Sequence, residues 1–251
     1  MRIRALVAMA FAVPVLVLMA LTAGPAGASS DQFRYKGRIS GGRVVDGSGS
    51  GNPGIIVTAN GGSVTSRTDG GNAFLHFPGG HCTRSSGCPQ AMVKPAKTTK
   101  LNPGNGGLGT FRFGASIRLT QTSKTGMNVL QRGSYGGSQW KLQADYAEAS
   151  CRWSDGTHSL MLPNDHYAKF ALRLDTWYRV TCSRLAGNVF EFRVSKPSGA
   201  IIQVRRWTEH RIGAITPTSA VTIGAKKVSG GSDARTDQFH GDLDDIFFHR
   251  N

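Results

Sequence analysis

The chain has 251 residues, and its 30 Lys and Arg residues exceed its 15 Asp and Glu residues, which gives a formal net charge of +15. After residue 28 no stretch approaches the ~20 apolar residues that a membrane-spanning helix needs, so the sequence excludes a membrane span from that part of the chain. The remaining length of about 220 residues fits one all-β domain, and the positive charge favours anionic partners.

The N-terminus has the pattern of a secretory signal peptide. Arg2 and Arg4 precede an apolar run at residues 5–21, and small residues follow as far as Ala28. We therefore expect residues 1–28 to be removed and the mature chain, with a net charge of about +13, to be secreted into an oxidising environment. Outside the cell a basic protein meets glycans and anionic cell-surface polymers, and we expect no nucleic-acid partner.

Most of the mature chain alternates apolar and polar residues, which is typical of half-buried β-strands. We expect a first strand within 29–45. Further strands are predicted at 55–58, 73–77, 110–119, 127–131, 139–145, 149–153, 177–184, 189–194, 201–207, 221–223 and 239–249. The Pro-, Gly- and Lys-rich stretch 94–109 is interpreted as a surface loop rather than a linker. Many short strands without crossover helices predict an antiparallel sandwich or barrel.

Four cysteines in a secreted chain predict two disulfides. Cys82 and Cys88 enclose a short loop, whereas Cys151 and Cys182 each lie in a predicted strand. We predict the pairs Cys82–Cys88 and Cys151–Cys182. Their spacing lacks the Cys-x-x-Cys pattern of zinc and redox sites.

Several short motifs, in order, resemble the laminin-G and concanavalin-A-like superfamily of lectins and glucanases. They are Asp-Gly-Ser-Gly-Ser-Gly-Asn at 46–52, the glycine-led strand at 71–77, the tryptophan-led strand at 174–181, Thr-Ile-Gly at 222–224 and Phe-His-Gly-Asp-Leu-Asp-Asp-Ile at 239–246. The resemblance runs from about Asp46 to the end. It implies an all-β, antiparallel two-sheet jelly-roll sandwich over residues 46–251. The Pro-Ser-Gly turn at 197–199 and the insertion at 82–88 depart from the family pattern.

The resemblance also implies a structural calcium site. In the family, a carboxylate of the opening turn meets one of the terminal Asp-Asp strand, and oxygen ligands suit a hard cation. Transferred to this chain, the ligands are Asp46, Asn52 and Asp245. Alternatively, Asp46 and Asn52 only form hydrogen bonds within the turn.

The residues give little support for catalysis. Retaining glycoside hydrolysis needs two carboxyl groups about 5 Å apart, yet Glu148, Glu191 and Glu209 stand alone and no Glu-x-Asp-x-x-Glu pattern occurs. The Arg-x-Glu-x-Arg and Gln-x-His strands of alginate-type lyases are absent from the sequence too. We predict no catalytic residues. The alternative is a polysaccharide lyase or glycoside hydrolase of jelly-roll fold, with the lyase as the better of the two.

Basic and polar side chains on predicted strands suit carboxylate, sulfate or phosphate groups of a glycan. The candidate binding residues are Arg112, Arg118, Lys141, Gln143, Arg152, Arg179, Arg193 and Tyr135. Trp153 and Trp207 are further candidates for stacking on sugar rings, while Trp140 and Trp177 are interpreted as structural.

The sequence therefore predicts a secreted, monomeric, non-catalytic lectin-like module that binds a glycan or an anionic cell-surface polymer, with Ca²⁺ as the one expected cofactor. A protein-binding adhesion module is the remaining alternative. Fold alone does not decide between these functions.

Overall fold

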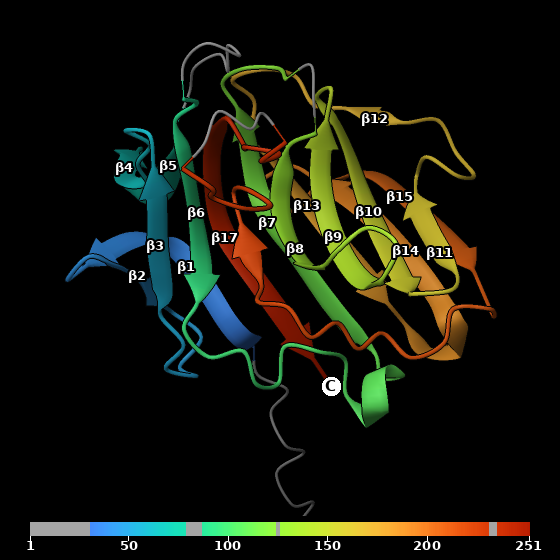
Figure 1. Cartoon of the computed structure of the whole chain (residues 1–251). Coiled ribbons are helices and arrows are strands. Elements are labelled where there is room, and N and C mark those ends of the chain that lie inside the picture. Colours follow the sequence, from blue (N-terminus) through green and yellow to red (C-terminus); the bar gives the residue numbers. More distant parts are fainter. Residues whose placement is uncertain (1–30, 79–86, 124–125, 231–234) are drawn as a thin grey trace, which may run out of the picture.

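The computed structural model describes residues 31–78, 87–123, 126–230 and 235–251, and this part of the chain is built from antiparallel strands (Figure 1). The strands are β1 Asp31–Ser40, β2 Arg43–Asp46, β3 Gly54–Ala59, β4 Thr65–Asp69, β5 Asn72–Phe77, β6 Gln90–Pro95, β7 Phe111–Leu119, β8 Asn128–Gly133, β9 Ser138–Asp145, β10 Glu148–Asp155, β11 Ser159–Leu162, β12 Phe170–Ala171, β13 Tyr178–Arg184, β14 Val189–Ser195, β15 Ile201–Thr208, β16 Thr222–Ile223 and β17 Gly241–Arg250. Two single-turn 3₁₀ helices, η1 Asn105–Gly107 and η2 Ala186–Asn188, complete the described secondary structure. The prediction of an all-β antiparallel fold is confirmed.

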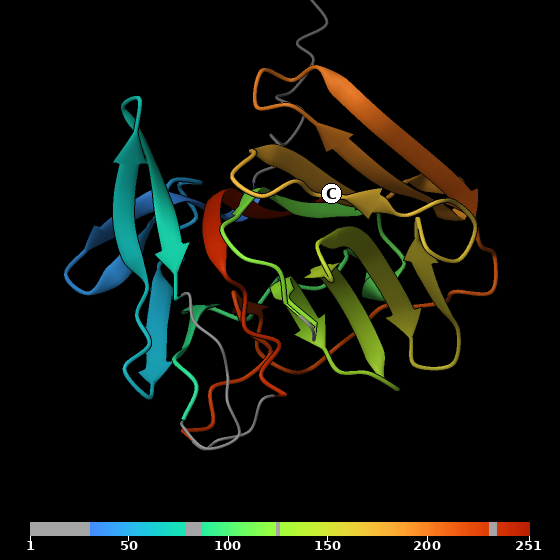
Figure 2. The same ribbon diagram turned by 90° about the horizontal axis from the view of Figure 1, so that it is seen from above.

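Two runs of paired strands surround the interior. One run is β2–β1–β17–β7–β13–β14–β15, with β5 also paired to β17. The other run is β3–β6–β16–β8–β9–β10–β11. The short β2–β3 pairing joins the two runs on one side, which gives the fold a nearly barrel-like form. Figure 2, seen from above, shows β13 to β15 on one side of the interior and β8 to β10 on the other.

Each of the eleven strands predicted from residue 55 onward is present within two residues of the expected bounds. The first strand also lies where it was expected, and it pairs with the last one, Tyr35 opposite Ile246. Prediction missed β2, β4, β6, β11 and β12. Every residue of β4 is exposed, and all residues of β6 but one are buried, so neither strand shows alternation. The stretch 96–110 forms a loop that carries η1.

A fully buried aromatic cluster fills the interior. The ring centroid of Trp140 on β9 lies 4.8 Å from that of Phe113 and 4.9 Å from that of Phe248. Trp153 is also fully buried, so the idea that it stacks on a sugar is wrong. Burial confirms the structural interpretation of Trp140.

Trp177 is only partly buried. Its ring packs edge-on against Phe74 at 5.5 Å, and the Arg118 guanidinium lies over it at 4.9 Å. These contacts hold Trp177 at the surface rather than in the core.

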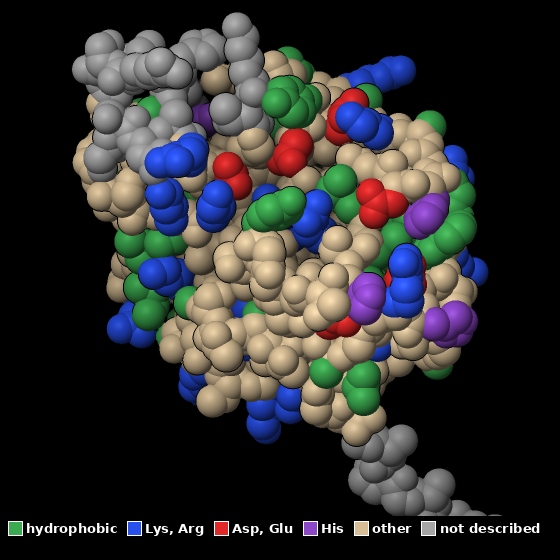
Figure 3. Space-filling view, turned by 45° about the vertical axis from the view of Figure 1, so that its right-hand side comes forward, with side chains coloured by type: hydrophobic (Ala, Val, Ile, Leu, Met, Phe, Trp, Pro, Cys, Tyr) green, Lys and Arg blue, Asp and Glu red, His purple; other side chains and the backbone are tan. Residues whose placement is uncertain are grey.

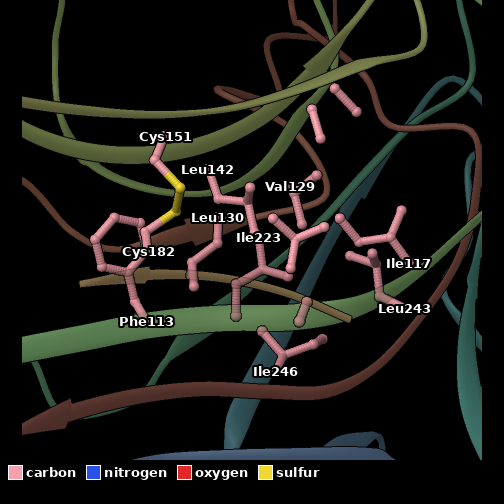
Figure 4. Close-up of a cluster of buried hydrophobic side chains, with 14 of the residues drawn as sticks. Phe113, Ile117, Val129, Leu130, Leu142, Cys151, Cys182, Ile223, Leu243 and Ile246 are labelled. Carbon is pink, nitrogen blue, oxygen red and sulfur yellow. A yellow bond between two sulfur atoms is a disulfide. The ribbon is translucent and has the colours of Figure 1, made fainter. Parts of the chain in front are cut away.

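A disulfide links Cys151 on β10 to Cys182 on β13, as predicted, and so ties the two runs together through the core (Figure 4). The other predicted disulfide involves Cys82, which lies outside the described residues, as do the signal peptide at 1–28 and its cleavage site. No helix within the described ranges is both long and apolar enough to span a membrane.

Candidate functional site

The structure does not bring the predicted binding residues together on one face. Lys141, Gln143, Arg152 and Tyr135 line one hollow. Arg112, Arg179 and Arg193 line a groove on the outer side of the other run of strands. Arg118 lies apart from both, with its guanidinium bonded to Asp242 at 2.8 Å and to Asp69 at 3.1 Å.

We call the first hollow the Lys141 pocket. Its volume is about 650 Å³. It is lined by Met92, Lys94, Gln131, Gly133, Ser134, Tyr135, Gln139, Lys141, Gln143, Asp145, Arg152, Ser219, Ala220, Thr222, Lys226, Lys227, Val228 and Asp237. Strands β6, β8, β9, β10 and β16 supply its floor, and the loop around Tyr135, the segments 219–221 and 226–228 and the loop residue Asp237 supply its walls.

Strand alternation places the floor residues. In β9, Trp140 and Leu142 point into the core, so Lys141 and Gln143 between and after them point outward into the pocket. Lys141 lies opposite Gln131 of β8 and opposite Arg152 of β10. Cross-strand neighbours share a face, and the three side chains therefore form one row across the pocket floor.

The pocket lining carries five basic side chains and two carboxylates. The Lys141 and Lys226 ammonium groups each lie 3.8 Å from one Asp237 carboxylate oxygen. Burial lowers the pKa of Lys141, although Asp145 and Asp237 act in the opposite direction, and burial raises the pKa of Asp145. The excess of positive charge favours an anionic ligand.

Amide groups add hydrogen-bonding capacity to the pocket. The Gln143 side-chain amide donates to Asp145 at 2.6 Å, and the Gln131 amide donates to the Gly133 carbonyl at 3.2 Å. The Gln131 side-chain oxygen is buried and has no partner among the residues that the structure describes. Amide groups that line a pocket suit a ligand rich in hydroxyl groups.

Tyr135 forms the exposed rim of the pocket, next to Arg152 of the pocket floor. Tyr135 is 87% exposed, and the Arg152 guanidinium lies 5.3 Å from the centre of its ring. An aromatic ring held in this way offers a surface for a sugar ring. Figure 3 shows one side of the molecule, where Lys and Arg side chains are scattered among acidic, hydrophobic and uncharged ones. The charge on this side is therefore mixed rather than uniformly basic.

Sequence reasoning missed Lys94, Gln131, Gln139, Lys226 and Asp237 in this pocket. Gln139 could have been found, because it shares the outward face of β9 with Lys141 and Gln143. Lys226 and Asp237 lie outside the strands and carried no periodic signal.

The residues predicted to bind calcium have other partners. The carboxylate of Asp46 accepts hydrogen bonds from the backbone N–H groups of Arg34, Ser48 and Asn52, each at 2.9 Å. The Asn52 side-chain oxygen accepts from the Lys97 N–H at 2.7 Å. These contacts match the alternative in which Asp46 and Asn52 stabilise a turn.

Asp245 forms ion pairs with Arg34 and Arg179, one guanidinium at each carboxylate oxygen. Guanidinium groups therefore hold the positions where a cation would approach, and the three residues do not fit a calcium site as they are arranged here. The calcium site stays a prediction, and the melting temperature in EDTA tests it.

Stability is expected to fall in acid. Burial opposes ionisation of Asp46, Glu191 and Asp245, but hydrogen bonds and arginine partners outweigh it and keep the pKa of each below its ordinary value of 3.8 for Asp or 4.5 for Glu. Below about pH 4.5 these carboxyl groups therefore bind more protons in the unfolded chain than in the folded chain. Urea unfolding should show the free energy of unfolding decreasing from pH 5 to pH 3, whereas Asp46→Asn should flatten this dependence. A urea unfolding midpoint that rises from pH 5 to pH 3 would contradict this prediction.

No family model and no curated protein sequence matches the chain. Solved structures do match. The botulinum neurotoxin serotype D binding domain has 15% identity and a TM-score of 0.51, over 88% of this chain and 48% of that one. The serotype G binding domain has 11% identity and a TM-score of 0.54, over 87% and 47%.

A third match comes from work on the cell entry of botulinum neurotoxin type C, described as dependent upon interaction with two ganglioside molecules. Its identity is 10% and its TM-score 0.51, over 88% of this chain and 48% of that one. The likeness is one of fold. The chain spans about half the length of these toxin domains, and its fold is similar to the part that it covers.

Proposed function

We propose that this chain is a secreted, monomeric, non-catalytic module, a two-sheet jelly roll of the laminin-G and concanavalin-A-like kind, that binds an anionic glycan in the Lys141 pocket. The observation that carries the proposal is the composition of that pocket. Five basic side chains, three glutamine amides and one exposed tyrosine ring converge on a single hollow. Cations bind acidic groups, amides bind hydroxyls, and the ring packs on a sugar.

The structural neighbours support a binding role. All three are toxin binding domains or related structures, and one is described through its interaction with gangliosides. At 10–15% identity this support concerns the kind of module and not the ligand.

The test removes positive charge from the pocket but keeps Lys141, which balances the pocket carboxylates Asp145 and Asp237. In the variant Lys94→Gln/Arg152→Gln/Lys226→Gln, we expect affinity for an oligouronate to fall by about tenfold or more, since charge-assisted hydrogen bonds contribute most to anion binding. Isothermal titration at 50 mM salt measures it. The matched control, Arg43→Gln/Arg67→Gln/Lys100→Gln, loses the same charge at exposed positions outside the pocket. Equal affinity of the two triple variants would refute the assignment.

The same samples test the alternatives. Incubation with alginate, polyglucuronate and pectate would give ultraviolet absorbance from an unsaturated product if the protein is a lyase. Failure of the wild-type protein to bind any anionic glycan at low salt would favour the protein-binding adhesion module.

A further inference from the structure

A second group of basic residues lies on the opposite face of the molecule. We call it the arginine groove: a hollow of about 520 Å³ lined by Arg34, Arg112, Arg179, Thr181, Ser183, Leu185, Glu191, Arg193, Arg206 and Phe247. These residues come from β1, β7, β13, β14, β15 and β17, with Leu185 just after β13. We propose that the arginine groove is a second, independent binding site for the sulfate or carboxylate groups of an extended acidic polysaccharide. This goes beyond the function proposed for the Lys141 pocket and does not depend on it.

The disulfide shows that the two sites face away from each other. Cys151 and Cys182 meet in the core. Neighbouring side chains on a strand point to opposite faces, so Arg152 points outward from β10 and Thr181 points outward from β13. Arg152 lines the Lys141 pocket and Thr181 lines the arginine groove. One chain therefore presents two basic hollows on opposite sides.

Strand register aligns the groove. Phe247 of β17 lies opposite both Arg34 of β1 and Gly114 of β7, and Thr181 of β13 lies opposite Gly114 and Arg193 of β14. At a strand spacing of about 4.8 Å, the four steps from β1 to β14 cover about 19 Å. Gly114 is buried in the middle of this row, where it lies against the Phe247 ring. A groove of this length suits a segment of polymer better than a single small ion.

Two carboxylates hold four of the five arginines in place. Asp245 pairs with Arg34 and Arg179. Both guanidinium groups also lie over the Phe247 ring, at 4.9 and 5.3 Å from its centre.

On the other side of the groove, Glu191 pairs with Arg193 at 3.0 Å and with Arg206 at 2.7 Å. A guanidinium has five N–H donors, so these ion pairs leave donors for a ligand. Because the side chains are already ordered, binding costs less conformational entropy.

Arg112 differs from the other four. It is exposed and has no ion pair or hydrogen bond among the residues that the structure describes. Its strand neighbours are His249 and Ser183, and Ser183 also lines the groove. Planar guanidinium groups bind carboxylate and sulfate oxygens in pairs, so an unpaired arginine in the same groove as the fixed ones is the expected first contact of an acidic polymer.

The test uses Arg112→Gln/Arg206→Gln, which keeps one arginine partner for Glu191 and leaves Asp245 untouched. The matched control is Arg43→Gln/Arg67→Gln. The probes are a heparin hexasaccharide, which carries sulfate, and an oligoguluronate hexasaccharide, which carries only carboxylate. Thermal melting confirms that each variant is folded. Isothermal titration of the wild-type protein should give two sites per chain for at least one probe.

We expect the groove variant to lose one of the two sites, or to weaken it by about tenfold or more, while the control keeps both. The probe affected identifies the acidic group. Loss of the groove site with unchanged binding in the Lys94→Gln/Arg152→Gln/Lys226→Gln variant would reject the pocket and retain the groove. If the groove variant matches its control with both probes, the proposal is wrong.

Discussion

Replacing Cys151 and Cys182 together by alanine is expected to lower the free energy of unfolding by about 3 to 4 kcal/mol. The disulfide closes a loop with a sequence separation of 31 between β10 and β13, strands of different runs that share no pairing. Without it the unfolded chain gains freedom, and alanine also leaves two small voids, because both cysteines are fully buried. For a chain of this size the loss corresponds to a melting temperature lower by roughly 10 °C.

Differential scanning calorimetry of the double variant and the wild-type protein, both in the presence of reductant and in its absence, measures this effect. The variant should respond to reductant less than the wild-type protein does. A melting temperature equal to that of the oxidised wild-type protein would show that the link does not stabilise the fold.

Trp140→Ala is expected to have an effect of similar size, about 3 to 5 kcal/mol. The ring packs against Phe113 and Phe248 at centroid distances of 4.8 and 4.9 Å, and all three side chains are fully buried. The adjacent residue, Lys141, belongs to the pocket floor, so a displaced β9 should weaken glycan binding as well. Urea unfolding together with titration of the glycan measures both effects.

The matched control is Trp207→Ala, which truncates a ring that is 38% exposed and should cost roughly 1 kcal/mol or less. Trp140→Phe should fall between the two, because it keeps an aromatic contact and removes a buried indole N–H that has no partner in the described chain. If the Trp140→Ala and Trp207→Ala variants were equally stable, Trp140 would not belong to the buried aromatic cluster.

Alternation made much of the fold predictable. The run from Phe111 to Leu119 and the run from Ser138 to Asp145 each place apolar residues on one face, and both are strands. Alternation fails where a strand is exposed or buried on both faces, as in β4 and β6. The family resemblance placed the opening turn next to the terminal Asp-Asp strand, and β1 and β17 do pair, although no family model matches the chain.

The candidate site was harder to predict for a physical reason. A strand pattern shows that Arg112 and Lys141 both point outward, but it does not show to which layer each strand belongs. The structure places Arg112 in the arginine groove and Lys141 in the pocket on the other face. Loop residues such as Lys226 come near Lys141 only through long-range packing, which has no local signature in the sequence.

The role of the acidic and amide residues in the opening turn could not be decided from the sequence either. Asp46 and Asn52 have the oxygens of a cation site, and the same oxygens accept hydrogen bonds in a tight turn. Only the three-dimensional structure shows that backbone N–H groups donate hydrogen bonds to these oxygens. Two arginines likewise use Asp245, because β1 and β13 bring Arg34 and Arg179 to either side of it.

The side-chain amide signals of the pocket glutamines offer the most direct test of glycan binding. In a ¹⁵N nuclear magnetic resonance titration with an oligouronate, the NH₂ signals of Gln139 and Gln143 should shift saturably, and those of Gln203 on β15, outside the pocket, should not. Raising the salt concentration should reverse the shifts. Saturable binding of the glycan with the Gln139 and Gln143 signals unmoved would show that the ligand does not enter the Lys141 pocket.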